Sequence, residues 1–309
     1  MAASPEAVGR AYWMLAGAAL FWSGNFVVAR AFVADIAPVT LAYWRWQLAL
    51  LVFLPFAWRA LYRERRILLR HFGWLLVMGL LGVAGFNTLV YQGLQYTTAT
   101  NALLINSFIP ILIIVIGVLL PDPGGRGWRQ LAGVLISSTG MLLLIMRGQW
   151  QNLLALRFNQ GDLWLLLAAL LWALYSIGLR WRPGGLSARA FLLATMLIGI
   201  TLLGPLYWFN LAGEPAFSPR PSSVLAIAYV ALFASLGAFL LWNQGIAMVG
   251  AARGGQFIHL MPLFGALLAI TLLGERLAWY HFGGGLLIGL GIYLTLRQQQ
   301  ARKGPAVTR

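Results

Sequence analysis

The chain has 309 residues, of which 61% are apolar and only 9% are charged. An ordinary soluble domain has roughly 45 to 50% apolar and about 25% charged residues, so this composition places the chain in a lipid bilayer. The net charge of +15 does not indicate nucleic-acid binding, because the basic residues gather in connections between apolar runs, where they orient membrane spans. The absence of cysteine excludes disulfides, thiolate nucleophiles and Cys-based metal sites.

Ten apolar stretches are long enough to be transmembrane helices, because a bilayer core about 30 Å thick needs about 20 helical residues. Their length excludes barrel strands, which have about ten residues of alternating polarity. The first stretch contains Trp22, Asn25 and Arg30, so we interpret it as a retained span and not as a signal peptide. The ten stretches cover residues 11–30, 38–58, 73–93, 100–120, 129–147, 162–180, 187–209, 222–248, 251–273 and 279–297.

The basic residues also predict the orientation of the chain. Of the 22 Lys and Arg residues, sixteen fall in connections on one predicted face and five on the other, with Arg45 left inside the second span. Basic residues are enriched on the cytoplasmic side of membrane proteins. We therefore expect both termini to be cytoplasmic.

A stretch in the first half of the chain returns in the second. An offset of 152 residues places the run from Gln92 to Pro110 on the run from Gln244 to Pro262, with glycine and alanine also matched inside the runs. Offsets of 150 and 151 match further tryptophan, proline and glycine residues elsewhere. Chance similarity between apolar sequences is the alternative, but it would also have to supply the matched prolines. The pattern favours an internal duplication.

The duplication divides the chain into residues 1–152 and 153–309, with five predicted spans in each half. Because five is an odd number, the second half enters the membrane from the opposite side. This arrangement is an inverted-topology repeat, which places a substrate site at the interface of the repeats near the membrane midplane. We predict an all-α integral membrane protein of ten transmembrane helices in a five-plus-five inverted repeat, with a central cavity lined by spans 1, 3, 4, 6, 8 and 9.

Polar and aromatic side chains at membrane depth are the candidates for this cavity, because the backbone of a membrane helix is satisfied internally. Amides, indoles and phenols can hydrogen-bond a polar metabolite, and aromatic faces can hold its apolar or cationic part. The alternative is that they bond one helix to another. The predicted substrate-binding residues are Trp22, Asn25, Tyr91, Gln92, Asn101, Asn106, Tyr175, Trp242, Gln244, Gln256 and His259.

Four residues have two open interpretations each. His259 either titrates during transport or packs as a neutral residue. Arg45, the only charge well inside a span, is either an anion contact or gate, or a structural residue that reaches toward carbonyls or the interface. Pro110 and Pro262 are expected to kink the fourth and ninth spans at matched depth, either as gating hinges or as static kinks.

Intramembrane carboxylates are lacking, since the seven acidic residues fall at span ends, in connections or in the N-terminal tail. This argues against an enzyme and against ion coupling through a buried acid. The three histidines show no metal-ligand spacing, so we expect no metal and no cofactor; the expected partners are a small-molecule substrate and the bilayer. Small residues in the last span of each half predict close helix packing, or alternatively a homodimer through these spans. They are Gly133, Ser137, Gly140, Gly285, Gly289 and Gly291.

Over nearly its whole length the chain resembles the drug/metabolite transporter superfamily in its ten-span EamA-type branch. Two features depart from the pattern, namely Pro121-Asp122-Pro123 where the second half has Gly274-Glu275, and Trp172-Ala173 where the family often has Trp-Gly. The resemblance is carried by Trp22-Ser23-Gly24-Asn25, by Pro38 and Arg45, by the run from Gly93 to Pro110 with its repeat from Gly245 to Pro262, and by Leu273-Gly274-Glu275.

The resemblance implies export of amino acids or related metabolites across the bacterial inner membrane, and the exporters of aromatic amino acids are the nearest likeness. One rival is a carrier of sugar phosphates or nucleotide sugars, which would require cations in the cavity. A second rival is multidrug efflux, which the aromatic lining fits but the lack of an intramembrane carboxylate does not. A membrane enzyme or a scaffold without transport activity is the alternative of a different class.

Overall fold

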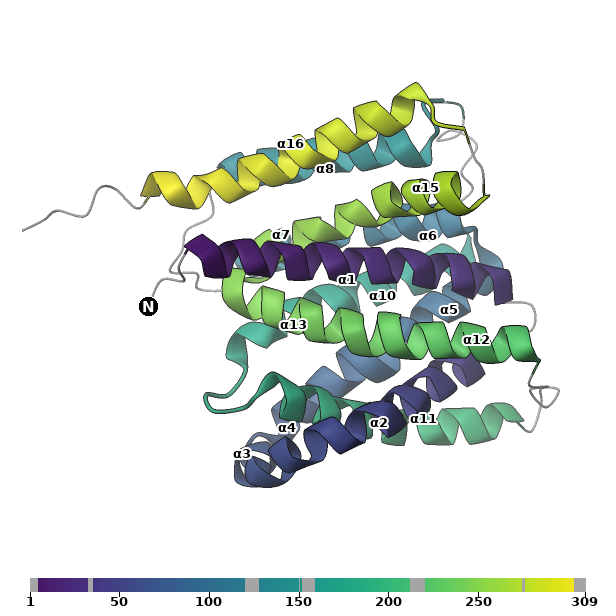
Figure 1. The fold of residues 1–309 in the computed structure, drawn as a ribbon, viewed down its shortest axis with the longest axis vertical. Coiled ribbons are helices and arrows are strands. Elements are labelled where there is room, and N and C mark those ends of the chain that lie inside the picture. Colours follow the sequence, from purple (N-terminus) through teal and green to yellow (C-terminus); the bar gives the residue numbers. More distant parts are fainter. Residues whose placement is uncertain are drawn as a thin grey trace, which may run out of the picture.

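The structure, a computed structural model, describes residues 5–32, 36–119, 128–149, 151, 159–211, 220–273 and 276–302. Within these ranges the chain is helical and contains no strand. The motifs at residues 121–123 and 274–275, and the predicted boundary after residue 152, lie outside the described residues. Figure 1 shows the helices stacked side by side with their axes roughly aligned.

The first half begins with two long helices and ends with one, and its third predicted span contains a π-helical segment. The elements are α1 (Pro5–Phe32), α2 (Pro38–Arg63), α3 (Arg65–Arg70), α4 (Phe72–Gly79), the π-helix η1 (Leu80–Gly85), α5 (Phe86–Tyr96), α6 (Ala99–Asn106), α7 (Ile109–Val118) and α8 (Trp128–Ile145).

The second half repeats this sequence of elements, including a π-helical segment at the matched position. The elements are α10 (Gln160–Gly178), the 3-10 helix η2 (Leu179–Trp181), α11 (Ala188–Leu211), α12 (Pro221–Tyr229), the π-helix η3 (Val230–Gly237), α13 (Ala238–Val249), α14 (Ala251–Gly254), the 3-10 helix η4 (Gly255–His259), α15 (Leu260–Leu273) and α16 (Trp279–Arg302).

Each of the ten predicted stretches coincides, within a few residues, with a helix or an interrupted helix. Among the described residues, five helical segments are long and apolar enough to cross a bilayer. That all ten stretches cross, and that the halves do so in opposite senses, stays a prediction. The five segments are Pro38–Arg63, Phe72–Tyr96, Gln160–Trp181, Ala188–Phe209 and Pro221–Val249.

Local sequence signals explain where several helices begin. Pro38 and Pro221 stand at the first positions of α2 and α12, where a missing N–H costs no hydrogen bond. A capping box opens α10: Asn159 Oδ1 accepts from the backbone N–H of Gly161 at 2.7 Å, and Asp162 Oδ2 accepts from the N–H of Asn159 at 2.9 Å. Asp162 therefore lies at a helix start, as its position at the edge of an apolar run predicts.

Helices of one half pack mainly against helices of the other. α1 packs along α13 and α10 packs along α5, while α2 packs along α11 and α8 along α16. The repeat offset exchanges α1 with α10 and α5 with α13. It therefore turns the contact between α1 and α13 into the contact between α10 and α5. The contacts of α2 with α11 and of α8 with α16 are each mapped onto themselves. Figure 1 shows α8 and α16 side by side at one edge of the bundle, with α2 and α11 near the opposite edge.

The predicted close packing through small residues is confirmed between α8 and α16 for Gly133, Ser137, Gly140 and Gly291. It is wrong for Gly285, which faces Leu263 of α15, and for Gly289, whose Cβ position is open; Gly284, one residue before Gly285, makes the contact instead. A Cβ atom placed on Gly140 would lie 2.6 Å from the carbonyl oxygen of Gly284, and one placed on Gly284 would lie 2.8 Å from that of Gly140. Real Cβ atoms do not approach oxygen so closely, so the backbones meet only because both residues are glycine. These small residues pack within one chain, and a homodimer through the same helices stays a prediction.

The contact between α8 and α16 generates a test of stability. Gly140→Ala should lower the free energy of unfolding by about 1 to 3 kcal/mol, because the added methyl group forces the two backbones apart. The measurement is the thermal unfolding midpoint of the purified protein in detergent. Gly289→Ala is the matched control, since a Cβ at this position of α16 would meet no atom within 4 Å. Equal midpoints for the two variants would contradict the described packing.

Candidate functional site

A buried arginine bonds to side chains from both halves. Arg45, on α2, has no exposed surface. Its Nε donates a hydrogen bond to Ser235 Oγ at 2.7 Å, and its Nη1 donates to Asn87 Oδ1 at 2.9 Å and to the hydroxyl oxygen of Tyr91. Asn87 and Tyr91 belong to α5, in the first half, whereas Ser235 belongs to η3, in the second. The guanidinium therefore joins the two halves.

Each π-helix is linked to this guanidinium through one side chain, which accepts a hydrogen bond from Arg45 and donates one to a carbonyl of the π segment. Asn87, two residues beyond η1, donates Nδ2 to the carbonyl of Gly82 at 3.5 Å, and Ser235 donates Oγ to the carbonyl of Val230 at 2.8 Å. In each case the side chain bonds to a carbonyl five residues earlier, which is the spacing of π-helical hydrogen bonds. Asn87 and Ser235 also accept from Arg45, so one cation holds the matched irregular segment of each half.

The predicted face of α1 contributes to the same network. The hydroxyl of Tyr91 donates to Asn25 Oδ1 at 3.1 Å. Trp22, one turn before Asn25, donates its Nε1 to the carbonyl of Ala234 in η3 at 3.0 Å. All these side chains are buried. Two of the predicted binding residues on α1 thus have specific partners, Asn25 on α5 and Trp22 on η3, and their role in binding substrate stays a prediction.

An aromatic cluster adjoins the arginine network. The ring centroids of Trp22 and Trp172 are 5.1 Å apart, those of Trp22 and Trp242 are 5.2 Å apart, and those of Trp172 and Trp242 are 5.8 Å apart. Phe239 packs edge-on against Trp46, the neighbour of Arg45, at 4.9 Å. Most of the ring pairs are tilted or edge-to-face, which are favourable aromatic geometries. The cluster gives the arginine network an apolar wall with contributions from α1, α2, α10 and α13.

The polar ends of these rings are bonded within the cluster. Trp242 donates Nε1 to Ser176 Oγ at 3.3 Å, and the hydroxyl of Tyr175 donates to Asn243 Oδ1 at 2.8 Å. The amide nitrogen of Asn243 is buried and has no partner among the described residues. It is a donor that a polar ligand group could use.

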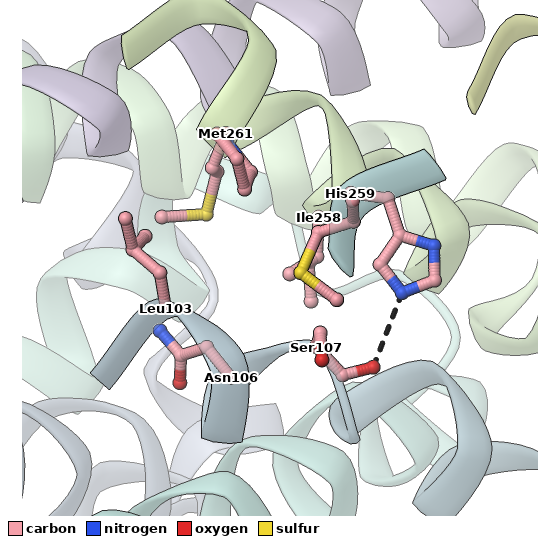
Figure 2. Close-up of a pocket in the computed structure, with 8 residues that line it drawn as sticks. Leu103, Asn106, Ser107, Ile258, His259 and Met261 are labelled. Carbon is pink, nitrogen blue, oxygen red and sulfur yellow. Dashed lines mark hydrogen bonds between the residues drawn. The ribbon is translucent and has the colours of Figure 1, made fainter. Parts of the chain in front are cut away.

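A second polar site lies around His259, at the end of η4. His259 Nδ1 is 2.7 Å from Ser137 Oγ on α8, and Nε2 is 3.1 Å from the carbonyl oxygen of Ser107. Figure 2 shows His259 facing Ser107 beside a crevice, with the dashed line marking their hydrogen bond. The crevice is too narrow to hold a water molecule. Its lining residues are Leu103, Asn106, Ser107, Met141, Ile258, His259, Met261 and Pro262.

The matched prolines follow breaks in their helices. Pro110 is the second residue of α7, which is separated from α6 by a turn at 107–108. Pro262 is the third residue of α15, directly after the 3-10 helix η4. Proline cannot donate the hydrogen bond that would continue a helix through its position. The predicted irregularities at matched places in spans 4 and 9 are therefore present, and their role as hinges stays a prediction.

The other predicted binding residues are not brought into the arginine network. Gln256 donates to Thr295 Oγ1 on α16 at 2.6 Å, and Asn101 donates to Asp162 Oδ1 at the start of α10 at 3.4 Å. Both bonds join one helix to another, which is the alternative interpretation of intramembrane amides. Gln92 and Gln244 are half-buried at matched positions on α5 and α13.

The predicted binding residues do not include Asn87 and Trp172, which the structure places in the site, nor Ser235, Trp46 and Phe239. Ser235 was hidden because a single serine in an apolar span carries no distinctive signal. Trp46 and Phe239 were hidden because an apolar ring at membrane depth is indistinguishable in sequence from a lipid-facing one. The one available signal for Ser235 is positional, since it lies within the second-half repeat of the segment that precedes Asn87 in the first half.

The comparison with known proteins agrees with this duplicated fold. The sequence pattern of the EamA-like transporter family matches residues 9–146 and again residues 159–297. The chain belongs to the EamA-like transporter family. This EamA protein is thus a multi-pass membrane transporter and not an enzyme.

Similar proteins are found in bacteria and archaea. The EamA protein is 30% identical over 286 residues to an uncharacterized transporter of Bacillus subtilis, YyaM, covering 91% of this chain and 92% of that protein. It is 28% identical over 298 residues to an uncharacterized transporter of Archaeoglobus fulgidus, covering 94% and 98%. A solved crystal structure with 18% sequence identity covers 98% of this chain and 100% of its own, with a TM-score of 0.74, and shares the fold.

The arginine network predicts a specific loss of stability. Ser235→Ala should lower the free energy of unfolding by about 1 to 3 kcal/mol, because a buried charged N–H then lacks its acceptor. Thermal unfolding in detergent measures the effect. Ser222→Ala, at an exposed position of α12, is the control and should leave the midpoint unchanged. An unchanged midpoint for Ser235→Ala would show that the hydrogen bond from Arg45 contributes nothing.

Proposed function

We propose that this EamA transporter exports amino acids or related small metabolites across the bacterial inner membrane by alternating access, with both termini in the cytoplasm. The observation that carries the proposal is the joint site of the two halves. Arg45, Asn87, Tyr91 and Asn25 of the first half meet Ser235 of the second in one buried hydrogen-bond network. A site at the interface of two repeats is where an alternating-access carrier binds its substrate.

The chemistry of the site supports a small polar substrate with an apolar portion. The hydrogen-bond network offers charged, amide and phenolic groups. The adjoining cluster of Trp22, Trp172, Trp242 and Phe239 offers aromatic rings. An amino acid combines a carboxylate and an ammonium group, which need hydrogen bonds or opposite charge, with a side chain that can pack on rings. The aromatic amino acids fit this combination most directly.

Movement between the two access states needs places where helices bend. The π-helices η1 and η3 and the interrupted helices before Pro110 and Pro262 are irregular segments in matched pairs. Irregular turns lack the regular hydrogen bonds that stiffen an α-helix, and π segments often occur at functional sites. We propose that each half bends at these places as the site changes its access.

Sugar-phosphate transport and multidrug efflux are the rival functions, and the site argues against each of them. A phosphate dianion calls for more than one positive charge, and in the described network Arg45 supplies a single one. Multidrug efflux would use the aromatic cluster without the arginine. A scaffold without transport activity would give no flux with any solute.

Transport by the purified protein in proteoliposomes tests the function. We expect saturable flux of at least one radiolabelled amino acid, strongest among the aromatic ones. Tyr175→Phe should raise KM by several-fold, because it removes a hydroxyl from the cluster and keeps the ring. Tyr62→Phe, exposed on α2, is the control. The absence of saturable flux with any amino acid would contradict the proposal, and competition by sugar phosphates would favour the rival carrier.

The hinge role of the matched prolines is tested separately. Pro262→Ala should lower the maximal flux several-fold and leave KM nearly unchanged, because alanine permits a regular helix that resists bending. Pro205→Ala removes an exposed proline from the interior of α11 and serves as control. An unchanged maximal flux in Pro262→Ala would mean that the break before α15 is static.

A further inference from the structure

The guanidinium of Arg45 has one nitrogen that no described residue uses. Nε and Nη1 donate to Ser235, Asn87 and Tyr91, but Nη2 is completely buried and has no hydrogen-bond partner. Buried polar groups in folded proteins almost always have partners, and an unsatisfied donor on a charged group costs more than one on a neutral group. Nη2 is therefore an unoccupied donor on a charged group, available to a ligand that reaches the site.

The charge of Arg45 also lacks compensation in the described part of the chain. Its three hydrogen-bond acceptors are a hydroxyl, an amide oxygen and a phenol, all of them neutral. A charged residue inside a membrane span normally pairs with an opposite charge or lines a water-filled path. These neutral acceptors satisfy the hydrogen bonding of Nε and Nη1, but they do not compensate the positive charge. A bound anion would supply both the missing acceptor and the missing charge.

The repeat shows that this charge belongs to one half only. The offset of 150 residues places Arg45 on Thr195 of α11. The hydroxyl of Thr195 is bonded within its own helix, 3.0 Å from the carbonyl oxygens of both Phe191 and Leu192. The duplicated position therefore provides neither a second cation nor an acid to neutralise the first. One uncompensated positive charge matches one negative charge on a ligand.

The surroundings of the guanidinium indicate what the rest of the ligand resembles. Arg45 Cζ lies 5.4 Å from the ring centroid of Trp46 and 5.7 Å from that of Tyr91. These rings, and Phe239 beyond Trp46, are apolar surfaces beside the charged group. A carboxylate attached to an apolar or aromatic group suits such a site better than a fully polar anion.

We propose that Arg45 binds the carboxylate of the transported metabolite through its free Nη2, so that the substrates are carboxylate monoanions or zwitterions with an apolar portion. The inference rests on the proposed transport function and specifies the chemical group that the site recognises. It also explains why a cation is retained at membrane depth, where it is costly in the absence of a ligand.

A pair of probes of nearly equal shape tests the recognition of charge. The thermal unfolding midpoint of the full chain in detergent is measured at increasing concentrations of benzoate and of benzamide at neutral pH. Benzoate should raise the midpoint, and its Kd should be at least about tenfold lower than that of benzamide, because only benzoate can form charge-assisted hydrogen bonds with Arg45. Equal effects of the two probes would overturn the proposal without any variant.

Variants assign the effect to the arginine. Arg45→Gln should abolish the difference between benzoate and benzamide, and Arg45→Lys, which keeps the charge, should retain part of it. Arg59→Gln removes an exposed arginine from the same helix and should keep the full difference. A preference for benzoate that survives in Arg45→Gln would contradict the proposal. Stronger stabilisation by inorganic phosphate than by benzoate would contradict the choice of a carboxylate.

The binding experiment and the flux experiment fail independently. Preferential binding of benzoate together with no amino-acid flux would refute the proposed transport of amino acids and keep the assignment of Arg45. Amino-acid flux together with equal binding of benzoate and benzamide would support transport and refute the role given to Arg45.

Discussion

Burial of one positive charge is the constraint on which the site depends. A guanidinium inside a membrane protein needs acceptors for its N–H groups, since lipid offers none. The Nε and Nη1 of Arg45 receive acceptors from α5 and from η3, so the two halves must meet at this residue. The same acceptors, Asn87 and Ser235, bond to carbonyls of the π segments. The charge, the irregular helices and the contact between the halves are therefore parts of one arrangement.

The features set by hydropathy and by helix-breaking residues were predictable from the sequence. Bilayer thickness fixes the length of apolar runs, so the helices lie where the runs lie. Proline removes a helix hydrogen bond, so the breaks before Pro110 and Pro262 agree with residue type, although Pro55 and Pro205 lie inside continuous helices and residue type alone does not decide where a helix breaks. Glycine allows close backbone approach, so the contact of Gly133 with Gly291 follows from the small-residue stripes, whereas the contact of Gly140 with Gly284 lies one residue away from the predicted Gly285. Each of these properties depends on the residue itself and its near neighbours.

The features set by contacts between distant residues were not predictable. π-Helical turns have no characteristic composition, so η1 and η3 are invisible in the sequence. Whether an amide faces a site or another helix depends on which helix packs beside it: Asn25 joins the arginine network, whereas Gln256 bonds to Thr295. Ser235 acquires its role only because η3 packs against α2, and no property of a lone serine reports that contact.

The separation of the partners of Arg45 along the chain bears on how the protein is made. Asn87 and Tyr91 follow the arginine by 42 and 46 residues, but Ser235 follows it by 190. Because a chain is synthesised from its N-terminus, the ribosome has produced α2 long before η3 exists. An arginine inside a span raises the cost of insertion, up to about 2.5 to 3.5 kcal/mol when it lies at the centre, and Arg45 is the eighth residue of the 26 in α2. The other, apolar residues of α2 must therefore offset this cost before η3 has been made. The hydrophobicity of α2 is then a requirement for inserting the protein into the membrane.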